Sequence, residues 1–180
     1  YASTGSNGDM FNVMGATGGQ GGMTVEVLKS AREVSYLLDN MDPAEAAKYQ
    51  YIKHMFSPIL VYLGMFDTDM YGDMPYTEAV MARYTNPMLL TPKFDTMEEL
   101  YTIWYDQLVE AVNVLSNPVT VNGTQITQTA LGAQDFVYGG NAAKWAKFAN
   151  SLKLKLAVRL LHQNKAKALA IAKEAAANPA

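Results

Sequence analysis

The stretch that most constrains the fold is residues 136–162, which reads FVYGG followed by NAAKWAKFANSLKLKLAVRLLH. Two glycines end the extended segment that leads into a predicted helix, and Asn141 stands where a helix N-cap residue is favoured. Apolar side chains then recur at three- and four-residue steps, which places them on one helical face: Trp145, Phe148, Ala149, Leu152, Leu156 and Leu160. Further apolar residues widen this face after Leu152, so we expect helices to pack on more than one side of it.

The same stretch resembles a signature of the SusD-like (SusD/RagB-type) outer-membrane lipoproteins. The shared positions read YGGN at 138–141, KW at 144–145 and FANSLKL at 148–154, followed by Ala157 and Arg159. Two positions depart from the family pattern, because Asn141 replaces the usual Asp and Lys155 the usual Arg. Asparagine also caps helices, whereas lysine keeps the charge but lacks the forked donor geometry of arginine.

Two upstream segments extend the resemblance. Residues 71–79, YGDMPYTEA, resemble the family's YGDVPYxEA, and residues 92–100, PKFDTMEEL, resemble a third family pattern. The three matches occur in the family's order and cover about the central half of the chain. The chain resembles an amino-proximal fragment of such a protein.

The resemblance implies both a fold and a function. It implies tetratricopeptide-like helical repeats and a lipid-anchored location at the outer-membrane surface, with the anchor absent from this chain. It also implies binding of oligosaccharides or polysaccharides and delivery to a SusC-like, TonB-dependent transporter. A helical-repeat scaffold that binds protein and has no sugar site is the alternative.

Composition excludes several other classes of protein. A net charge of −3 argues against nucleic-acid binding, and the absence of cysteine excludes disulfides, thiolate metal sites and cysteine nucleophiles. The two histidines, His54 and His162, lie in different predicted helices without metal-ligand spacing, and no Gly-x-Ser-x-Gly elbow is present. We therefore expect neither an enzyme nor a bound cofactor.

The pattern predicts an all-α, tetratricopeptide-like domain with one short β-hairpin and a long ordered loop. Residues 1–22 are predicted to form a Gly-rich irregular segment and residues 23–180 the helical domain, which is partial by the resemblance. The first helix should run over 24–38 from a Thr24 cap. The second should run from an Asp42 cap to about Asp67 and bend or split at Pro58.

Three further elements follow in the second half of the chain. A capping box of Thr96 and Glu99 starts a helix, and an Asn122-Gly123 turn between β-branched residues predicts a hairpin over 119–127. An alanine-rich helix over 165–177 ends the chain, with Leu169 among its inward residues.

The segment 68–94 is predicted to be a long ordered loop with three prolines and three tyrosines. Loops of this length without regular structure are uncommon unless they are functional. Aromatic rings beside polar groups suit sugars, whose C–H faces pack on the rings while their hydroxyls form hydrogen bonds. The predicted glycan-binding residues are Tyr71, Tyr84 and Asn86, whereas Tyr76 is expected to pack into the core.

A calcium loop is a competing interpretation of the same region. Asp67, Asp69, Gly72 and Glu78 fall at positions 1, 3, 6 and 12 of the EF-hand template. Tyr71 at position 5 and Pro75 at position 9 do not fit the template. The sequence favours the absence of a metal and leaves the calcium interpretation open.

Overall fold

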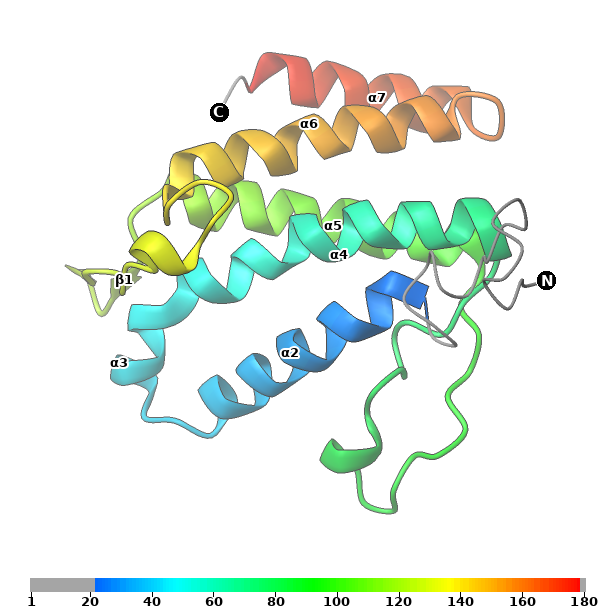
Figure 1. Cartoon of the computed structure of the whole chain (residues 1–180). Helices are drawn as coiled ribbons and strands as arrows, with labels where there is room; N and C mark the ends of the chain where they lie inside the picture. The colour runs from blue at the N-terminus through cyan, green and yellow to red at the C-terminus, as the bar shows by residue number, and fades with distance from the viewer. Residues whose placement is uncertain (1–21, 179–180) are drawn as a thin grey trace, which may run out of the picture.

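The computed structural model describes residues 22–178, whose helices stack in layers (Figure 1). Helices α6 and α7 form the upper layer, α4 and α5 the middle layer, and α2 lies against α4 below. The helical elements are α2 (Gly22–Asp39), α3 (Pro43–Ala46), η1 (Ala47–Tyr49), α4 (Gln50–Tyr71), η2 (Ala82–Tyr84), α5 (Met97–Ser116), η3 (Gly132–Gln134), α6 (Ala142–Leu160) and α7 (Lys165–Ala177). Two short strands, β1 (Thr120–Val121) and β2 (Thr124–Gln125), complete the fold. The predicted all-α, tetratricopeptide-like architecture is confirmed.

The core lies where α5 meets α4 and α6. Leu100, Trp104 and Leu108 of α5 are fully buried there, and Trp145 of α6 is buried as predicted. Gly64 of α4 faces the Trp104 ring so closely that an added Cβ would lie 2.4 Å from Trp104 Cζ2. The missing side chain at Gly64 therefore allows α4 and α5 to approach each other.

Three helix starts follow the predicted capping residues. The side chain of Asn141 accepts a hydrogen bond from the Lys144 amide at 3.0 Å, and Thr96 and Glu99 form the complete capping box of α5. Asp42 caps α3 by accepting from the amides of Ala44 and Glu45. Each cap satisfies N–H groups that have no partner within their own helix.

The start of the first helix differs from the prediction, because Thr24 is buried inside α2 and is not its cap. Asp67, which belongs to α4 and is distant in sequence, caps α2 instead. Its carboxylate accepts the amide of Thr24 at 2.9 Å and that of Met23 at 3.3 Å. A carboxylate at a helix N-terminus also complements the helix dipole, so this contact fixes the start of α2 against the last turns of α4. The predicted Gly-rich segment lies outside the described residues except for Gly22, the first residue of α2.

The second predicted helix is divided at η1 and not at Pro58, so the predicted split at Pro58 is wrong, whereas a bend there stays a prediction. Pro58 lies inside α4, where it is buried. At the actual break, main-chain groups find partners outside the helix: Gln128 Nε2 donates to the Ala47 carbonyl, and the Thr129 amide donates to the Lys48 carbonyl, both at 2.8 Å. These side contacts replace helical hydrogen bonds, whereas α4, which contains Pro58, is continuous and packs on α2, α5 and α6.

The predicted hairpin and last helix are both present. Asn122 and Gly123 have φ of 50° and 79°, the positive values that a type I′ turn requires. Helix α7 has the predicted bounds, but Leu169 is exposed and only Ala168, Ile171 and Ala175 are fully inward. No helix within residues 22–178 is long and apolar enough to cross a membrane.

The turn before α6 is built around Asp135, a residue that the sequence pattern does not single out. Its Oδ2 accepts Trp145 Nε1 at 2.6 Å and the Gly140 amide at 2.8 Å, and its Oδ1 accepts the amides of Val137 and Tyr138. Burial alone would raise the pKa of Asp135, but these four donors outweigh it and lower the pKa. Asp135 thus orients the Trp145 ring as α6 begins.

Candidate functional site

The candidate site is the loop between α4 and α5, residues 72–96, which projects from the helical layers (Figure 1). It is shorter at its start than the predicted 68–94 segment, because α4 continues to Tyr71. It also contains one helical turn, η2, and a single antiparallel bridge between Met74 and Asp95. The predicted long loop is therefore present, with more internal order than the sequence pattern indicates.

The base of the loop is fastened by the buried carboxylate of Asp95. Its Oδ2 accepts the amides of Tyr76 and Thr77 at 2.9 and 2.8 Å, and its Oδ1 accepts the Thr77 hydroxyl at 2.6 Å. Burial alone would raise the pKa of Asp95, but the hydrogen bonds from Thr77 and Tyr76 outweigh it and lower the pKa.

A second contact fastens the same two residues from the other side. Arg32 Nη2, from α2, donates to the carbonyls of Tyr76 and Thr77 at 3.0 and 2.9 Å. The carboxylate of Asp95 holds their amides, so the main chain of both residues is held through its donors and its acceptors. The loop is fixed to α2 by these bonds.

Tyr76 packs into the core, as the sequence predicts. Its ring is buried edge-on against Trp104 with ring centres 5.8 Å apart, and its hydroxyl donates to Gln107 Oε1 at 2.8 Å. Burial raises the pKa of Tyr76 to about 12. Tyr76 is thus a structural anchor of the loop and is not available to stack on a ligand.

Tyr84 ends η2 and lies against α2, where it forms an aromatic and charged cluster that we call the Tyr84 surface: Glu33, Tyr36, Arg83 and Tyr84. The Tyr84 hydroxyl donates to Glu33 Oε2 at 2.6 Å, and Arg83 Nη1 lies 3.0 Å from the same oxygen. The hydrogen bond to Glu33 raises the pKa of Tyr84 above its usual value. The rings of Tyr36 and Tyr84 are 5.1 Å apart at a tilt of 40°.

A shallow groove of about 710 Å³ runs beside this surface, between α2 and the loop. Val80, which lines it, has a φ of 62°. A β-branched residue rarely adopts this conformation, and such strain persists only where the surrounding structure enforces it. The groove therefore has a wall whose backbone shape is imposed by the fold.

The structure does not bring the three predicted glycan-binding residues into one contact. Tyr84 and the exposed Asn86 lie at and just after η2, whereas Tyr71 ends α4, away from η2 (Figure 1). Tyr71 as a whole residue is 46% exposed. Glu33 and Tyr36 were not among the predicted site residues, although their three-residue spacing on α2 puts them on one helical face. Three apolar residues of the loop are also exposed: Met88 at 61%, Leu90 at 72% and Phe94 at 68%.

The residues of the calcium template point to different partners. Asp67 caps α2, Asp69 pairs with Arg159, and Glu78 accepts the Lys93 amide at 2.8 Å. Within residues 22–178, no group of three or more His, Asp or Glu side chains is placed to hold a metal ion. The linear spacing fails because Asp67 and Asp69 belong to helix α4 and not to a turn.

A second polar cluster that the sequence did not reveal ties α5, α6 and α7 together. Lys153 of α6 is only 2% exposed, and its Nζ lies 2.8 Å from Glu174 Oε1 on α7. The hydroxyl of Tyr105 on α5 donates to the other oxygen of Glu174. Lysine is almost never fully buried unless it is paired, so this ion pair accounts for the position of Lys153.

Comparison with known proteins identifies the family. A sequence model of the family described as "Susd and RagB outer membrane lipoprotein" matches residues 25–180. A solved SusD homologue from Bacteroides vulgatus ATCC 8482 is 26% identical, with a TM-score of 0.65, over 84% of this chain and 27% of that one. A SusD homologue from Bacteroides uniformis ATCC 8492 is 30% identical, with a TM-score of 0.58, over 83% of this chain and 27% of that one.

A third solved structure, described as a chitin-binding protein, is 29% identical with a TM-score of 0.60, over 82% of this chain and 28% of that one. No curated protein matches the chain. The chain thus spans 27–28% of the length of these three solved relatives. With its three sequence signatures, its helical layers and the family match over residues 25–180, the chain belongs to the SusD-like family of outer-membrane lipoproteins.

Proposed function

We propose that this protein binds oligosaccharides or polysaccharides at the cell surface and passes them to a SusC-like, TonB-dependent transporter. The observation that carries the proposal is the Tyr84 surface, where two aromatic rings lie beside a carboxylate and a guanidinium on a fixed loop. The solved relative described as a chitin-binding protein supports a glycan as the class of ligand.

The chemistry of this surface suits a sugar. An exposed part of the Tyr36 or Tyr84 ring offers an apolar face for the C–H groups of a pyranose. Glu33 can accept hydrogen bonds from sugar hydroxyls, whereas Arg83 and the Asn86 amide can donate to them. The groove is open and shallow, which favours a run of sugar units along the surface over full enclosure of one unit.

The test is a titration of the chain with chitooligosaccharides, followed by a wider panel of glycans, by isothermal calorimetry. Tyr84→Ala should weaken binding about tenfold, since a stacked ring contributes about 1–2 kcal/mol. Tyr62→Ala is the matched control, because Tyr62 is an exposed tyrosine of α4 that lies outside the loop. Its affinity should equal that of the unmodified protein.

Tyr71→Ala and Asn86→Ala extend the test along the loop. Weaker binding by both Tyr71→Ala and Tyr84→Ala would indicate that the ligand reaches from η2 to the end of α4. Weaker binding by Tyr84→Ala and Asn86→Ala alone would indicate that the ligand contacts only the η2 end of the loop. If all three variants bind every ligand as the unmodified protein does, the sugar site is not on this loop.

The alternative function, a protein-binding scaffold without a sugar site, has its own observation. Met88, Leu90 and Phe94 expose apolar side chains on the same loop, and exposed apolar groups are typical of protein contacts. Failure of every glycan to bind, together with capture of the transporter by the chain, would favour the scaffold. We propose binding without catalysis in either case, because Glu33 and Arg83 pair with each other and form no acid–base arrangement.

A further inference from the structure

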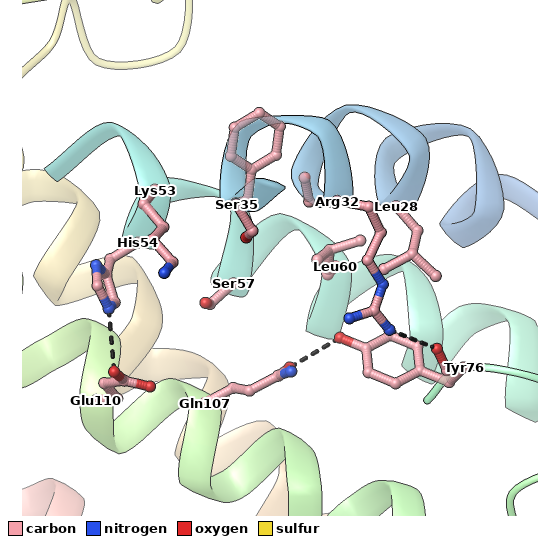
Figure 2. Close-up of a pocket in the computed structure, with 12 residues that line it drawn as sticks. Leu28, Arg32, Ser35, Lys53, His54, Ser57, Leu60, Tyr76, Gln107 and Glu110 are labelled. Atoms are coloured by element: carbon pink, nitrogen blue, oxygen red, sulfur yellow. Dashed lines mark hydrogen bonds and ion pairs between the residues drawn. The ribbon is translucent and has the colours of Figure 1, made fainter. Parts of the chain in front are cut away.

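A second cavity, of about 230 Å³, lies on another side of α2 and is called here the Arg32 pocket (Figure 2). Helix α2 contributes Arg32 and Ser35, and α4 contributes Lys53 and Ser57. Tyr76 and Gln107 close its lower side. The pocket shares only the Tyr76 anchor with the loop and none of the residues of the Tyr84 surface.

Positive charge is incompletely paired in this pocket. Nη2 of Arg32 holds two carbonyls of the loop, but its Nε is buried and has no hydrogen-bond partner among residues 22–178. The remaining nitrogen, Nη1, forms no hydrogen bond with the part of the chain that the structure describes, and it points toward the pocket in Figure 2. Among the described residues, Lys53 has a single, long ionic contact, 3.8 Å from its Nζ to an oxygen of the exposed Asp39. Glu110, the carboxylate that lines the pocket, lies 3.2 Å from His54 Nε2.

Neutral hydrogen-bonding groups also face this space. The hydroxyls of Ser35 and Ser57 line the pocket and form no hydrogen bond within residues 22–178. Gln107 accepts from Tyr76 through Oε1, which leaves the N–H groups of its amide available as donors. Leu28 and Leu60 add an apolar wall. The pocket thus offers cations, hydroxyls, an amide and an apolar wall.

We propose that the Arg32 pocket binds a hydroxylated monocarboxylate about the size of one sugar ring, such as a hexuronate. A carboxylate would complete the hydrogen bonding of Lys53 or Arg32, and ring hydroxyls would pair with Ser35, Ser57 and Gln107. The volume lies below the range of about 300–1,000 Å³ that holds drug-sized ligands, which favours a single ring. This site is independent of the oligosaccharide surface proposed above.

Titration with D-glucuronate, D-glucose and acetate tests the proposal by calorimetry on the 180-residue chain. Glucuronate should bind at least tenfold more tightly than either of the others. Glucose has the ring without the carboxylate, and acetate has the carboxylate without the ring. Absence of glucuronate binding at millimolar concentration, or equal binding of glucose or acetate, would overturn the proposal.

Lys53→Gln should weaken glucuronate binding about tenfold, because it removes a charge-assisted hydrogen bond. Lys48→Gln makes the same change at a half-exposed side chain outside the pocket, and this variant should bind glucuronate normally. Equal affinities for the two variants would show that glucuronate binds elsewhere. Arg32 is left unchanged because it also fastens the loop.

Two further measurements separate the pocket from the sugar surface and define the source of the ligand. Tyr84→Ala should keep full glucuronate affinity. A loss of affinity equal to that of Lys53→Gln would place glucuronate on the Tyr84 surface and refute the pocket.

Methyl glucuronide blocks the anomeric position as a glycan chain does. Its binding, at the affinity of glucuronate, would support the end of a chain as the ligand, whereas its rejection would support a free sugar acid.

Discussion

Replacing Asp135 by asparagine should destabilise the protein far more than the same change at Asp95, although both carboxylates are buried. All four donors to Asp135 are N–H groups: the amides of Val137, Tyr138 and Gly140, and the indole of Trp145. An asparagine side chain has one oxygen and one NH₂ group, so either orientation directs its NH₂ at two of these donors. An N–H group cannot accept a hydrogen bond, and two donors are therefore left unsatisfied.

The expected loss of stability follows from the number of unsatisfied donors. Each buried polar group left unsatisfied costs about 1–3 kcal/mol. If the asparagine oxygen stays opposite the Trp145 and Gly140 N–H groups, the amides of Val137 and Tyr138 face the NH₂ group and lose their acceptor. Because Val137 is partly exposed and water can reach its side of the turn, we expect a loss of about 3 kcal/mol in the free energy of unfolding.

Asp95→Asn is the matched control, because one of its donors can become an acceptor. The amide oxygen can replace Oδ2 opposite the Tyr76 and Thr77 amides, and the NH₂ group then faces the Thr77 hydroxyl. That hydroxyl can rotate and accept. Only the contact with the exposed Lys93 is lost, so we expect a cost of about 1 kcal/mol.

Urea unfolding monitored by tryptophan fluorescence and circular dichroism measures both variants at pH 7. The pKa of each aspartate is lowered in the folded state, so its contribution is present above the unfolded value of about 4 and is lost as the pH falls through the folded pKa. Each variant should therefore lose less stability than the unmodified protein as the pH is lowered below about 4. Equal stabilities of Asp135→Asn and Asp95→Asn at pH 7 would refute the donor count.

Three other substitutions test the packing and the hairpin. Gly64→Ala should lower the free energy of unfolding by about 1–3 kcal/mol, because the new methyl group overlaps the Trp104 ring; an unchanged urea midpoint would show that α4 and α5 can separate freely. Trp145→Ala should cost about 3–5 kcal/mol in the same assay, and a loss below 1 kcal/mol would contradict its core role. Gly123→Val should disrupt the hairpin locally, since valine disfavours a φ of 79°; unchanged amide-exchange protection at Ile126 would argue against the type I′ turn.

Features coded by local spacing could be predicted from the sequence. Helix caps at Asp42, Thr96 and Asn141 and the turn at Asn122-Gly123 all depend on residues within a few positions of one another. Helical periodicity likewise predicted the buried position of Trp145. Such signals survive folding because tertiary packing reinforces them.

Features created by contacts between distant segments could not be predicted. Asp67 caps a helix that begins more than forty residues earlier, and Gln128 takes up main-chain groups at the break near Ala47. The burial of Lys153 likewise depends on Glu174 of the next helix. In the candidate site, the tyrosines were found from composition, but Glu33 joins Tyr84 only through the fold. Asp67 and Asp69 resembled metal ligands only while their helical setting was unknown.

If the loop binds sugar as proposed, the fastening of Tyr76 and Thr77 from two sides has a consequence for how quickly the ligand would exchange. Arg32 and Asp95 fix this backbone before any ligand arrives, so binding need not order it at a cost of about 1–2 kcal/mol per residue. Association then requires only the encounter of a ligand with a preformed surface, and the dissociation rate sets the affinity. On so open a groove, bound ligand should exchange rapidly with ligand in solution.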